Sequence, residues 1–381
     1  MKRLLLLGSA LIFLFPLTGC WNSKDIQNMD YVTAIGLDFV DGKYITYVQV
    51  LNFTNIGRSE TLEVGKSVPI WVGKGEGSTI SESLSSIYAT SQMRIFWGHV
   101  KTIVCTENVL KRGVRDAYNA MNRFGDVRYN ILIFGTKEKL SDIFIQKSIF
   151  NLSPLDTLMF SPEQIYAQRS FIVPKTGNQV IAQINEPGEP GMLPSLTINK
   201  GTWREDKNSK SLLKINGAYF FNQDKMAAWL SEDELAGTRW SQKELKRSLI
   251  RIPAEGKAIA TMVMINPHYK VDIDVVDGKV WYDVSLKIDA TLDELMKDVS
   301  IDYLEQQASE VISDEIRESF HNGLKKQVDV LMLEETLYRN RPKEWHRLHK
   351  SQAFLLDHEC LRKIIVKVDL RNTGKYKGRT K

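Results

Sequence analysis

Apolar runs separated by short turn sequences dominate the first folded stretch of the chain, residues 31–53. Asp41-Gly42 lies between two of these runs and favours the type I′ turn of a hairpin, because both turn positions require a positive φ. Further along, Thr79 and Glu82 have the spacing of a capping box at the start of a helix. The apolar positions behind this box recur at helical spacing: Ile80, Leu84, Ile87 and Tyr88. The pattern therefore predicts a hairpin followed by an amphipathic helix.

Two further apolar runs, residues 99–106 and 127–136, predict buried strands. The residues between them predict a helix with one apolar face, formed by Leu110, Val114, Ala117, Tyr118 and Met121. Strands that alternate with helices of this length predict helices packed on a sheet. Residues 31–205 are therefore expected to form an N-terminal α/β region.

The periodicity weakens between about residues 150 and 210, where proline, glycine and polar residues are frequent. The polar stretch near 201–211 predicts an exposed linker or a long loop. We therefore expect a C-terminal domain over residues 206–381, and two possible subdomains before it, 31–148 and 149–205.

The second half begins with a predicted strand over residues 211–221, and Ser231 and Glu234 then form a second capping box that predicts a helix. Asp277-Gly278 lies between two alternating apolar stretches and predicts a second type I′ hairpin.

A long helix is predicted over about residues 303–333, and a closing strand over 363–371. The helix would be about 45 Å long at 1.5 Å per residue, and Gly323 could bend it. The expected fold class is α+β and multi-domain, with mixed or antiparallel sheets packed with helices and one long helix in the C-terminal domain.

The chain opens with a basic start and an apolar run that is shorter than the roughly 20 residues of a membrane-spanning helix. These features predict a secretory signal peptide over residues 1–19. Residues 17–20, Leu-Thr-Gly-Cys, match a bacterial lipobox, in which the cysteine sulfur takes a diacylglyceryl group and the preceding bond is cleaved. We therefore predict lipidation of Cys20 and a lipidated tether over residues 20–30. Two acyl chains anchor a protein stably, whereas one binds a membrane only reversibly.

The chain has 381 residues, of which 43% are hydrophobic and 25% charged, as in an ordinary globular protein. Residues 1–19 contain two basic residues and no acidic one, so their removal lowers the formal net charge from +5 to +3. The basic residues form no block typical of nucleic-acid binding, which argues against such a partner. After Cys20 no apolar run reaches membrane-spanning length, and the rest of the chain is expected to lie in water outside the membrane.

Cys105 and Cys360 are the other two cysteines. Cys105 lies in a predicted buried strand, where cysteine behaves as a small hydrophobic residue. Export would permit a disulfide between the two cysteines, but nothing in their spacing argues for one, and both states remain open.

Stretches that resemble catalytic motifs fail on spacing or order. The glycine-rich residues 73–79 lack the P-loop spacing, and they are expected to form the turn before the capped helix. Ser211–Lys214 and Lys175–Gly177 resemble two elements of penicillin-recognising enzymes, but their order is reversed and the third element is absent. We therefore predict no catalytic residue and no cofactor.

His346, His349, His358 and Cys360 are the strongest candidates for a metal site. Zinc-binding pairs usually have wider spacing than His346 and His349, and no CxxC pair accompanies them. We therefore predict exposed histidines at a helix end and no metal site. His99, just before a strand, is expected to be a structural histidine.

After the lipobox, the order of motifs resembles the Ger(x)C family, the lipoprotein C subunits of spore germinant receptors. The opening Gly-Cys-Trp is followed by Asn22 where the family has Asp, and the strand ending Gly-Leu-Asp is similar to the family's Gly-Ile-Asp. Later segments are similar to its His-strand-helix block, its Arg-x-x-acid-x-Arg strand and its terminal strand. The family-motif positions are Trp21, Asp25 (where the family has Glu), Gly36, Asp38, His99, Arg123 and Arg128.

This resemblance implies a non-enzymatic subunit needed for nutrient-triggered spore germination. It implies partners in two integral-membrane receptor subunits, of the A and B type, and a location on the outer face of the spore inner membrane. For Trp21, two roles remain open: contact with the membrane interface or a partner, and packing on the first strand. A solute-binding lipoprotein of an importer is the alternative function, although such proteins alternate βα units in two lobes.

Overall fold

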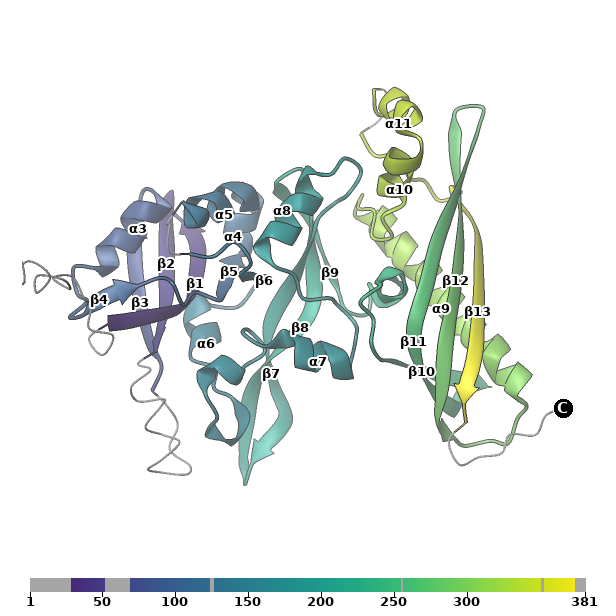
Figure 1. Ribbon diagram of the computed structural model, residues 1–381, viewed down its shortest axis with the longest axis horizontal. Helices are drawn as coiled ribbons and strands as arrows, with labels where there is room; N and C mark the ends of the chain where they lie inside the picture. The colour runs from purple at the N-terminus through teal and green to yellow at the C-terminus, as the bar shows by residue number, and fades with distance from the viewer. Residues whose placement is uncertain (1–28, 52–68, 124–126, 255, 351–352, 374–381) are drawn as a thin grey trace, which may run out of the picture.

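The structure is a computed structural model that describes residues 29–51, 69–123, 127–254, 256–350 and 353–373. Two sheets lie side by side, each with helices packed on it (Figure 1). The expected α+β class, with mixed sheets and one long helix near the C-terminal end, is confirmed.

The first sheet has nine strands among the described residues, in the order β3-β2-β1-β5-β6-β7-β8-β9, with β4 paired to β1. Its strands are β1 (Met29–Val40), β2 (Lys43–Leu51), β3 (Trp71–Gly77), β4 (Arg94–Phe96), β5 (Thr102–Thr106), β6 (Leu132–Thr136), β7 (Met192–Glu205), β8 (Asn208–Asn222) and β9 (Lys225–Ser231). Its helices are α3 (Ile80–Ile87), α4 (Glu107–Arg112), α5 (Val114–Asn122), α6 (Leu140–Phe144), α7 (Pro162–Gln168) and α8 (Gly177–Asn185).

The predicted hairpin and the capped helix after it are confirmed, but the strands predicted over residues 99–106 and 127–136 begin only at Thr102 and Leu132, and the helix between them is interrupted. Asp41 and Gly42 have φ of 50° and 80°, so they form the expected turn between β1 and β2. Thr79 caps α3 by accepting a hydrogen bond from the amide of Glu82. The single helix predicted after β5 is divided into α4 and α5 at Gly113, whose φ of 147° is outside the helical range.

The linker predicted near residues 201–211 is wrong, because this stretch forms the distal half of the long β7–β8 hairpin. Asp206 takes a positive φ of 55° in its turn. The hairpin extends beyond the helices at the bottom of Figure 1. Polar composition indicated exposure correctly, but two strands that pair with each other can be exposed without being a loop.

The helix predicted after Ser231 is also wrong. The hydrogen bonds of the capping box do form, since Ser231 and Glu234 bond each other through backbone and side chain. Residues before the box continue β9, and only a short 3-10 helix, Ala236–Ser241, follows it. Pairing of β9 with β8 decides the conformation of this stretch.

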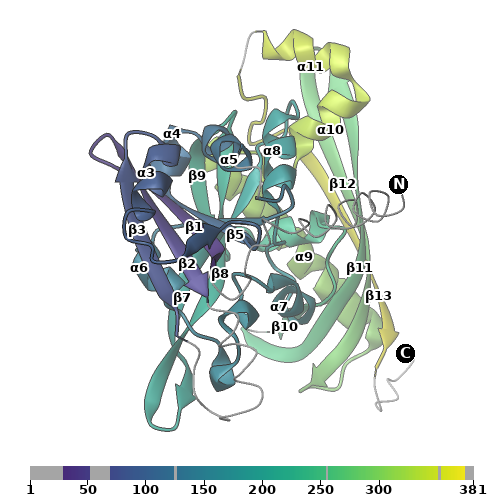
Figure 2. The same cartoon turned by 60° about the vertical axis from the view of Figure 1, so that its left-hand side comes forward.

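The second sheet has the order β10-β11-β12-β13, and α9 packs across one face. Its strands are β10 (Ser248–Ala254), β11 (Lys257–Val276), β12 (Lys279–Leu295) and β13 (Leu361–Asn372), and its helices are α9 (Ile301–Lys325), α10 (Leu333–Asn340) and α11 (Pro342–His349). Asp277 and Gly278 have φ of 50° and 81° and form the second predicted hairpin turn. The closing strand β13 runs parallel to β12, since the chain returns through α9, α10 and α11. Figure 2 shows these helices from a second side.

Helix α9 is shorter than predicted, because it ends at Lys325. The chain then turns back on the helix, and the amides of Lys326 and Val328 donate to the carbonyl of Gly323. A Cβ at Gly323 would lie 2.5 Å from the carbonyl oxygen of Val328, so only glycine permits this close approach. The 25 residues of α9 correspond to about 37 Å.

The two sheets share a hydrophobic core. One buried cluster joins Phe220 and Leu230 of the first sheet to Tyr282 and Val284 of the second and to Ile312 of α9. The domain boundary predicted at 205/206 falls inside the β7–β8 hairpin. The hydrogen-bonded strands of the first sheet continue beyond it to Ser231.

Cys105 and Cys360 are free thiols, each buried in a different hydrophobic cluster. Burial raises the pKa of each thiol to about 12, which keeps both protonated and unreactive near neutral pH. Of the two states left open by the sequence, a disulfide and two free cysteines, the structure has the free cysteines.

Candidate functional site

The positions predicted from the motifs fall into three groups. Cys20, Trp21 and Asp25 lie outside the described residues. Gly36 and Asp38 are on β1, and His99, Arg123 and Arg128 lie around β5 and α5.

Gly36 and Asp38 serve the packing of the first sheet. A Cβ at Gly36 would lie 3.0 Å from the Phe144 ring, so the glycine lets α6 pack against β1. The Asp38 carboxylate accepts hydrogen bonds from the Thr106 hydroxyl and, at 3.1 Å, from the Asn108 side chain. It therefore ties the end of β1 to the start of α4.

His99 packs among aromatic rings. Its ring centroid lies 5.0 Å from that of Tyr31 and 5.5 Å from that of Phe96. Burial lowers its pKa, and the positive charges of Arg128 and Lys101 act in the same direction. Packing among rings supports the structural role, which stays a prediction.

His99 contacts Tyr31, near the start of β1, whereas Gly36 and Asp38 lie further along that strand. The side chain of Arg123 is exposed at the end of α5. The described motif positions therefore do not converge on one site.

The structure reveals a cleft that the sequence did not indicate. It has a volume of about 740 Å³ and lies between α7, the segment before it, and the β7–β8 hairpin. Buried Leu158, Tyr166 and Ile172 line it, together with partly buried Leu213 and Ile215. A cleft of this size with apolar walls falls within the usual range of ligand and partner pockets.

A charged group closes one side of the cleft. Glu232 is only 7% exposed, and it pairs with Lys214 at 3.1 Å and with Arg169. The Arg169 guanidinium also lies 4.6 Å from the centroid of the Phe171 ring. Two cations held by one buried carboxylate leave a positive charge at this wall.

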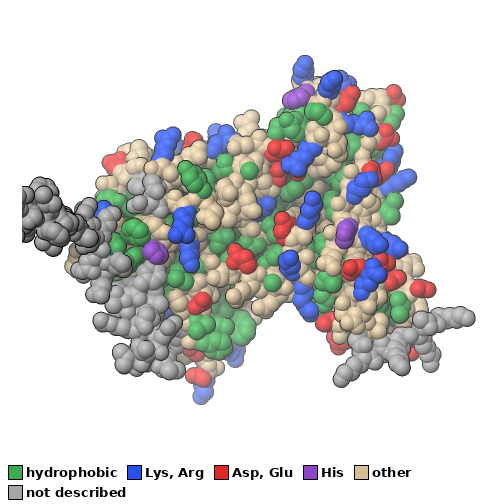
Figure 3. Space-filling model, in the orientation of Figure 1, with side chains coloured by type: hydrophobic (Ala, Val, Ile, Leu, Met, Phe, Trp, Pro, Cys, Tyr) green, Lys and Arg blue, Asp and Glu red, His purple; other side chains and the backbone are tan. Residues whose placement is uncertain are grey.

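Two large apolar side chains are exposed at the rim of the cleft. Ile165 and Trp203 line it and are 47% and 53% exposed. Figure 3 shows hydrophobic side chains gathered over this lower part of the molecule, whereas charges of both signs mix over the C-terminal part. Among the described residues that line the cleft there is neither histidine nor cysteine.

No local pattern predicts this cleft. Its walls come from α7, from a hairpin that was expected to be a linker, and from Glu232 at the end of β9. The burial of Glu232 could not be predicted from the residues around it, because its partners Arg169 and Lys214 are distant along the chain.

A buried acidic cluster lies at the start of α10. Asp329 accepts hydrogen bonds from the amides of Leu331 and Glu334 at 3.2 and 2.7 Å. Burial and the neighbouring carboxyl raise the pKa of Asp329 to about 8, and burial raises that of Glu334 to about 7. The Glu334 carboxyl also bonds His349 at 3.0 Å and the Leu355 amide at 2.9 Å.

The histidines considered for zinc are dispersed in the structure. His349 contacts Glu334, His346 packs against Trp345 and Tyr338, and His358 faces His321 at 5.8 Å between ring centroids. In the part of the chain that the structure describes, no group of three His, Cys, Asp or Glu side chains could hold a metal ion.

A search for membrane-spanning helices over the described ranges, 29–373 with their gaps, finds none that is long and apolar enough.

Comparison with known proteins gives consistent results over both halves of the chain. Residues 22–198 match the family model "Spore germination protein N-terminal domain", and residues 216–374 match "Spore germination B3/ GerAC like, C-terminal". The chain is 21% identical to spore germination protein KC of Bacillus subtilis (strain 168), over 91% of this chain and 90% of that protein. It is 20% identical to spore germination protein B3 of the same organism, over 74% and 72%.

A solved structure, described as the crystal structure of the GerBC protein, has the same fold. It superposes with a TM-score of 0.50 at 14% identity, covering 89% of this chain and 96% of that one. Since both family models match in order and together span nearly all of the described residues, the chain belongs to the Ger(x)C family of spore germination proteins.

Proposed function

We propose that this chain is the lipid-anchored, non-enzymatic C subunit of a nutrient receptor in the spore inner membrane. The observation that carries the proposal is the match of both family models, in order, behind a lipobox. The names of the relatives support a role in spore germination. Diacylglyceryl-Cys20 would hold the folded part at the outer face of the membrane.

We propose that the partners are two integral-membrane subunits of the A and B type. The lipidated tether, predicted over residues 20–30, extends no further than the start of β1 at Met29. It would keep the folded part near these subunits, and a short tether raises the effective concentration of a module to about the millimolar range. We also propose that the chain divides into an N-terminal region and a C-terminal domain, with the junction after β9.

Cys20→Ala is expected to remove the protein from the membrane fraction of spores and to impair germination with nutrients. The substitution removes the acyl chains and, since Cys20 precedes the folded residues, should leave the fold unchanged. The measurements are membrane fractionation and nutrient-triggered germination. Ser23→Ala, which keeps the lipidated cysteine, is the matched control. Normal membrane retention and germination of Cys20→Ala would show that contacts with partners suffice.

The alternative, a solute-binding lipoprotein of an importer, predicts tight binding of a nutrient. We expect calorimetry of the protein with amino acids and sugars to detect no micromolar binding, because the Glu232 ion pairs are the main polar cluster among the described residues of the cleft. Heat of binding that disappears in Lys214→Glu, but persists in the exposed control Lys243→Glu, would instead assign a solute site to the cleft.

A further inference from the structure

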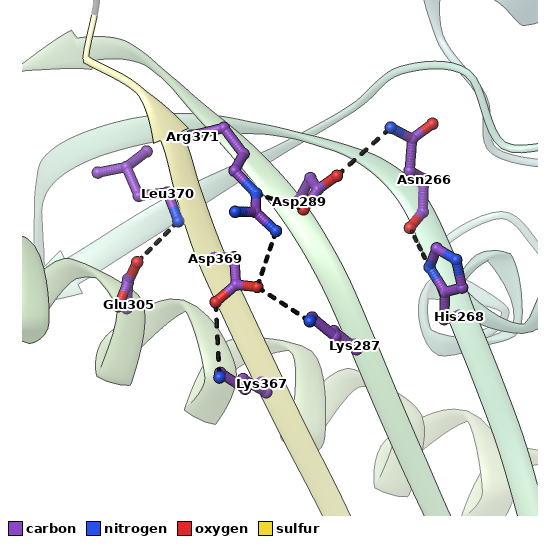
Figure 4. Close-up of polar contacts among 9 residues, drawn as sticks. All are labelled: Asn266, His268, Lys287, Asp289, Glu305, Lys367, Asp369, Leu370 and Arg371. Carbon is purple, nitrogen blue, oxygen red and sulfur yellow. Dashed lines mark hydrogen bonds and ion pairs between the residues drawn. The ribbon is translucent and has the colours of Figure 1, made fainter.

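The outer edge of β13 is open along its middle. β13 ends the second sheet, and β12 pairs only one side of it. Figure 4 shows Glu305 of α9 bonded to the amide of Leu370 at 2.7 Å, on the side of β13 away from β12. Alternate residues of a strand direct their backbone groups to the same side, so Ile364, Val366 and Val368 face this edge too. Among the described residues, none hydrogen-bonds to these outward amides and carbonyls.

A groove runs along this open edge. It has a volume of about 640 Å³, and its walls are β13 on one side and α9 on the other. The strand contributes Ile364–Val366, and Ile365 is 60% exposed. The helix contributes polar side chains: Gln306, Ser309, Glu310, Ser313, Asp314 and Arg317. An edge strand beside a helix can accept an extended segment as an added strand, whose backbone hydrogen bonds provide affinity.

The helix wall favours a cationic occupant. Glu310 and Asp314 are exposed acids on it, and Glu305 adds a third carboxylate at the end of β13. Arg317 is the basic residue of the wall, and it lies 3.7 Å from Asp314. The wall therefore suits an extended chain with basic side chains at every second position.

Residues 374–381, which follow β13 directly, have this pattern. Their sequence is Gly-Lys-Tyr-Lys-Gly-Arg-Thr-Lys, with basic residues at 375, 377, 379 and 381. Eight extended residues span about 26 Å, which is enough to run back along the middle of β13. We propose that the groove between α9 and β13 is a strand-accepting site, occupied by residues 374–381 of the same chain in antiparallel orientation.

The register follows from charge. A two-residue turn at 373–374 sets Lys377 opposite Leu370, Arg379 opposite Val368 and Lys381 opposite Val366. Directly opposite residues of an antiparallel pair share a face of the sheet, and the β13 residues pack on the face covered by α9. All four cations then face the acidic helix wall.

A shift by one residue reverses this arrangement. The cations would then lie on the other face, beside Lys367 and Arg371 of β13. Asp369 on that face is already paired with Lys287, Lys367 and Arg371. Repulsion between like charges therefore disfavours the shifted register. In the favoured register, the Leu370 amide donates its hydrogen bond to the added strand instead of to Glu305. The Glu305 carboxylate is then available to pair with Lys377.

Amide hydrogen exchange of the full-length protein tests the site. We expect exchange at Val366 and Val368 to be about tenfold or more faster after reversal of the four cations, Lys375→Glu, Lys377→Glu, Arg379→Glu and Lys381→Glu, because the added strand is lost. Reversal of four exposed cations elsewhere, at Arg204, Lys207, Lys243 and Lys257, is the matched control and should leave exchange at β13 unchanged.

A charge swap tests the proposed partners. Glu310→Lys with Asp314→Lys, added to the four-cation reversal, should restore slow exchange at β13. Equal exchange in the parent and the reversal variant would overturn the proposal. Slow exchange that occurs only in spore membranes, and fast exchange in the purified parent, would also overturn it, because the occupant would then be another chain.

Discussion

Arg239→Ala is expected to lower the free energy of unfolding by about 3–5 kcal/mol, because it removes a buried cation and leaves the partly buried Glu315 carboxylate without its partner. The Arg239 side chain is 3% exposed, and its guanidinium donates to both carboxylate oxygens of Glu315 at 2.9 Å. It also lies 4.3 Å from the ring centroids of Phe171 and Trp240, so it joins the end of the first sheet's region to α9.

Glu315 depends on this arginine. Its carboxylate also accepts from the Trp240 indole at 2.8 Å, yet burial raises its pKa above the ordinary value. Without the guanidinium the carboxylate would have to bind a proton or admit water, and both disturb the packing between Trp240 and α9.

Chemical denaturation at pH 7 measures this effect. Arg317→Ala, on α9 like Glu315, is the matched control. The Arg317 side chain is 54% exposed and lies 3.7 Å from Asp314. Adding Glu315→Gln to Arg239→Ala should restore part of the stability, because it removes the unpaired charge. A loss below about 1 kcal/mol for Arg239→Ala would mean that the pair contributes no more than a surface ion pair.

The free energy of unfolding should fall as the pH rises from about 5 to 8, owing to the buried carboxyl of Asp329. Its pKa is about 8 in the folded protein and ordinarily 3.8, so the folded state holds a proton that the unfolded state has released. Stability therefore decreases with pH across this window, by roughly 1.4 kcal/mol per pH unit for one proton. Glu334, with a pKa of about 7 against an ordinary 4.5, acts in the same direction up to pH 7.

The other groups around Asp329 do not reverse this trend. Burial lowers the pKa of His349, so that its contribution to stability is lost as the pH falls below 6.5 and opposes the acids only at the lower end of the window. Tyr269 and Tyr282 also face Asp329, and burial raises the pKa of both phenols far above the window. The Cys360 thiol, with a pKa of about 12, stays protonated.

Asp329→Asn should weaken the dependence, because the amide is neutral at every pH in this window and only Glu334 still acts, up to about pH 7. It is expected to destabilise the protein at pH 5, where it loses one acceptor for the amides of Leu331 and Glu334, and to be neutral or stabilising at pH 8. Denaturation curves at several pH values measure this, with the exposed Asp233→Asn as control. A parent protein with equal stability at pH 5 and pH 8 would contradict the assignment.

The sequence alone determined the features that depend on neighbouring residues. The two Asp-Gly turns form as predicted, because positive φ at both turn positions is a local requirement. The apolar face of α9 was also predicted, since Leu304, Ala308 and Ile312 repeat at helical spacing, although the helix begins at Ile301 behind the Ser300 cap rather than at about residue 303. The family resemblance rested on motifs of the same local kind.

The tertiary structure decided what depends on pairing between distant segments. The β7–β8 hairpin resembled a linker because neither strand buries a face along its distal half, and only their mutual pairing makes them strands. The residues after Ser231 contain the hydrogen bonds of a helix cap, but the strand before it and the contact with α9 leave room only for a short 3-10 helix.

The same reason explains why the sites were not predictable. Glu232 meets Arg169 and Lys214 only after the strands align, and Arg239 meets Glu315 across 76 positions of the chain. Whether a charge is buried, and which partner it finds, depends on the packing of whole elements. Local periodicity records which face of a strand or helix is apolar, but it contains no record of which other element will cover that face.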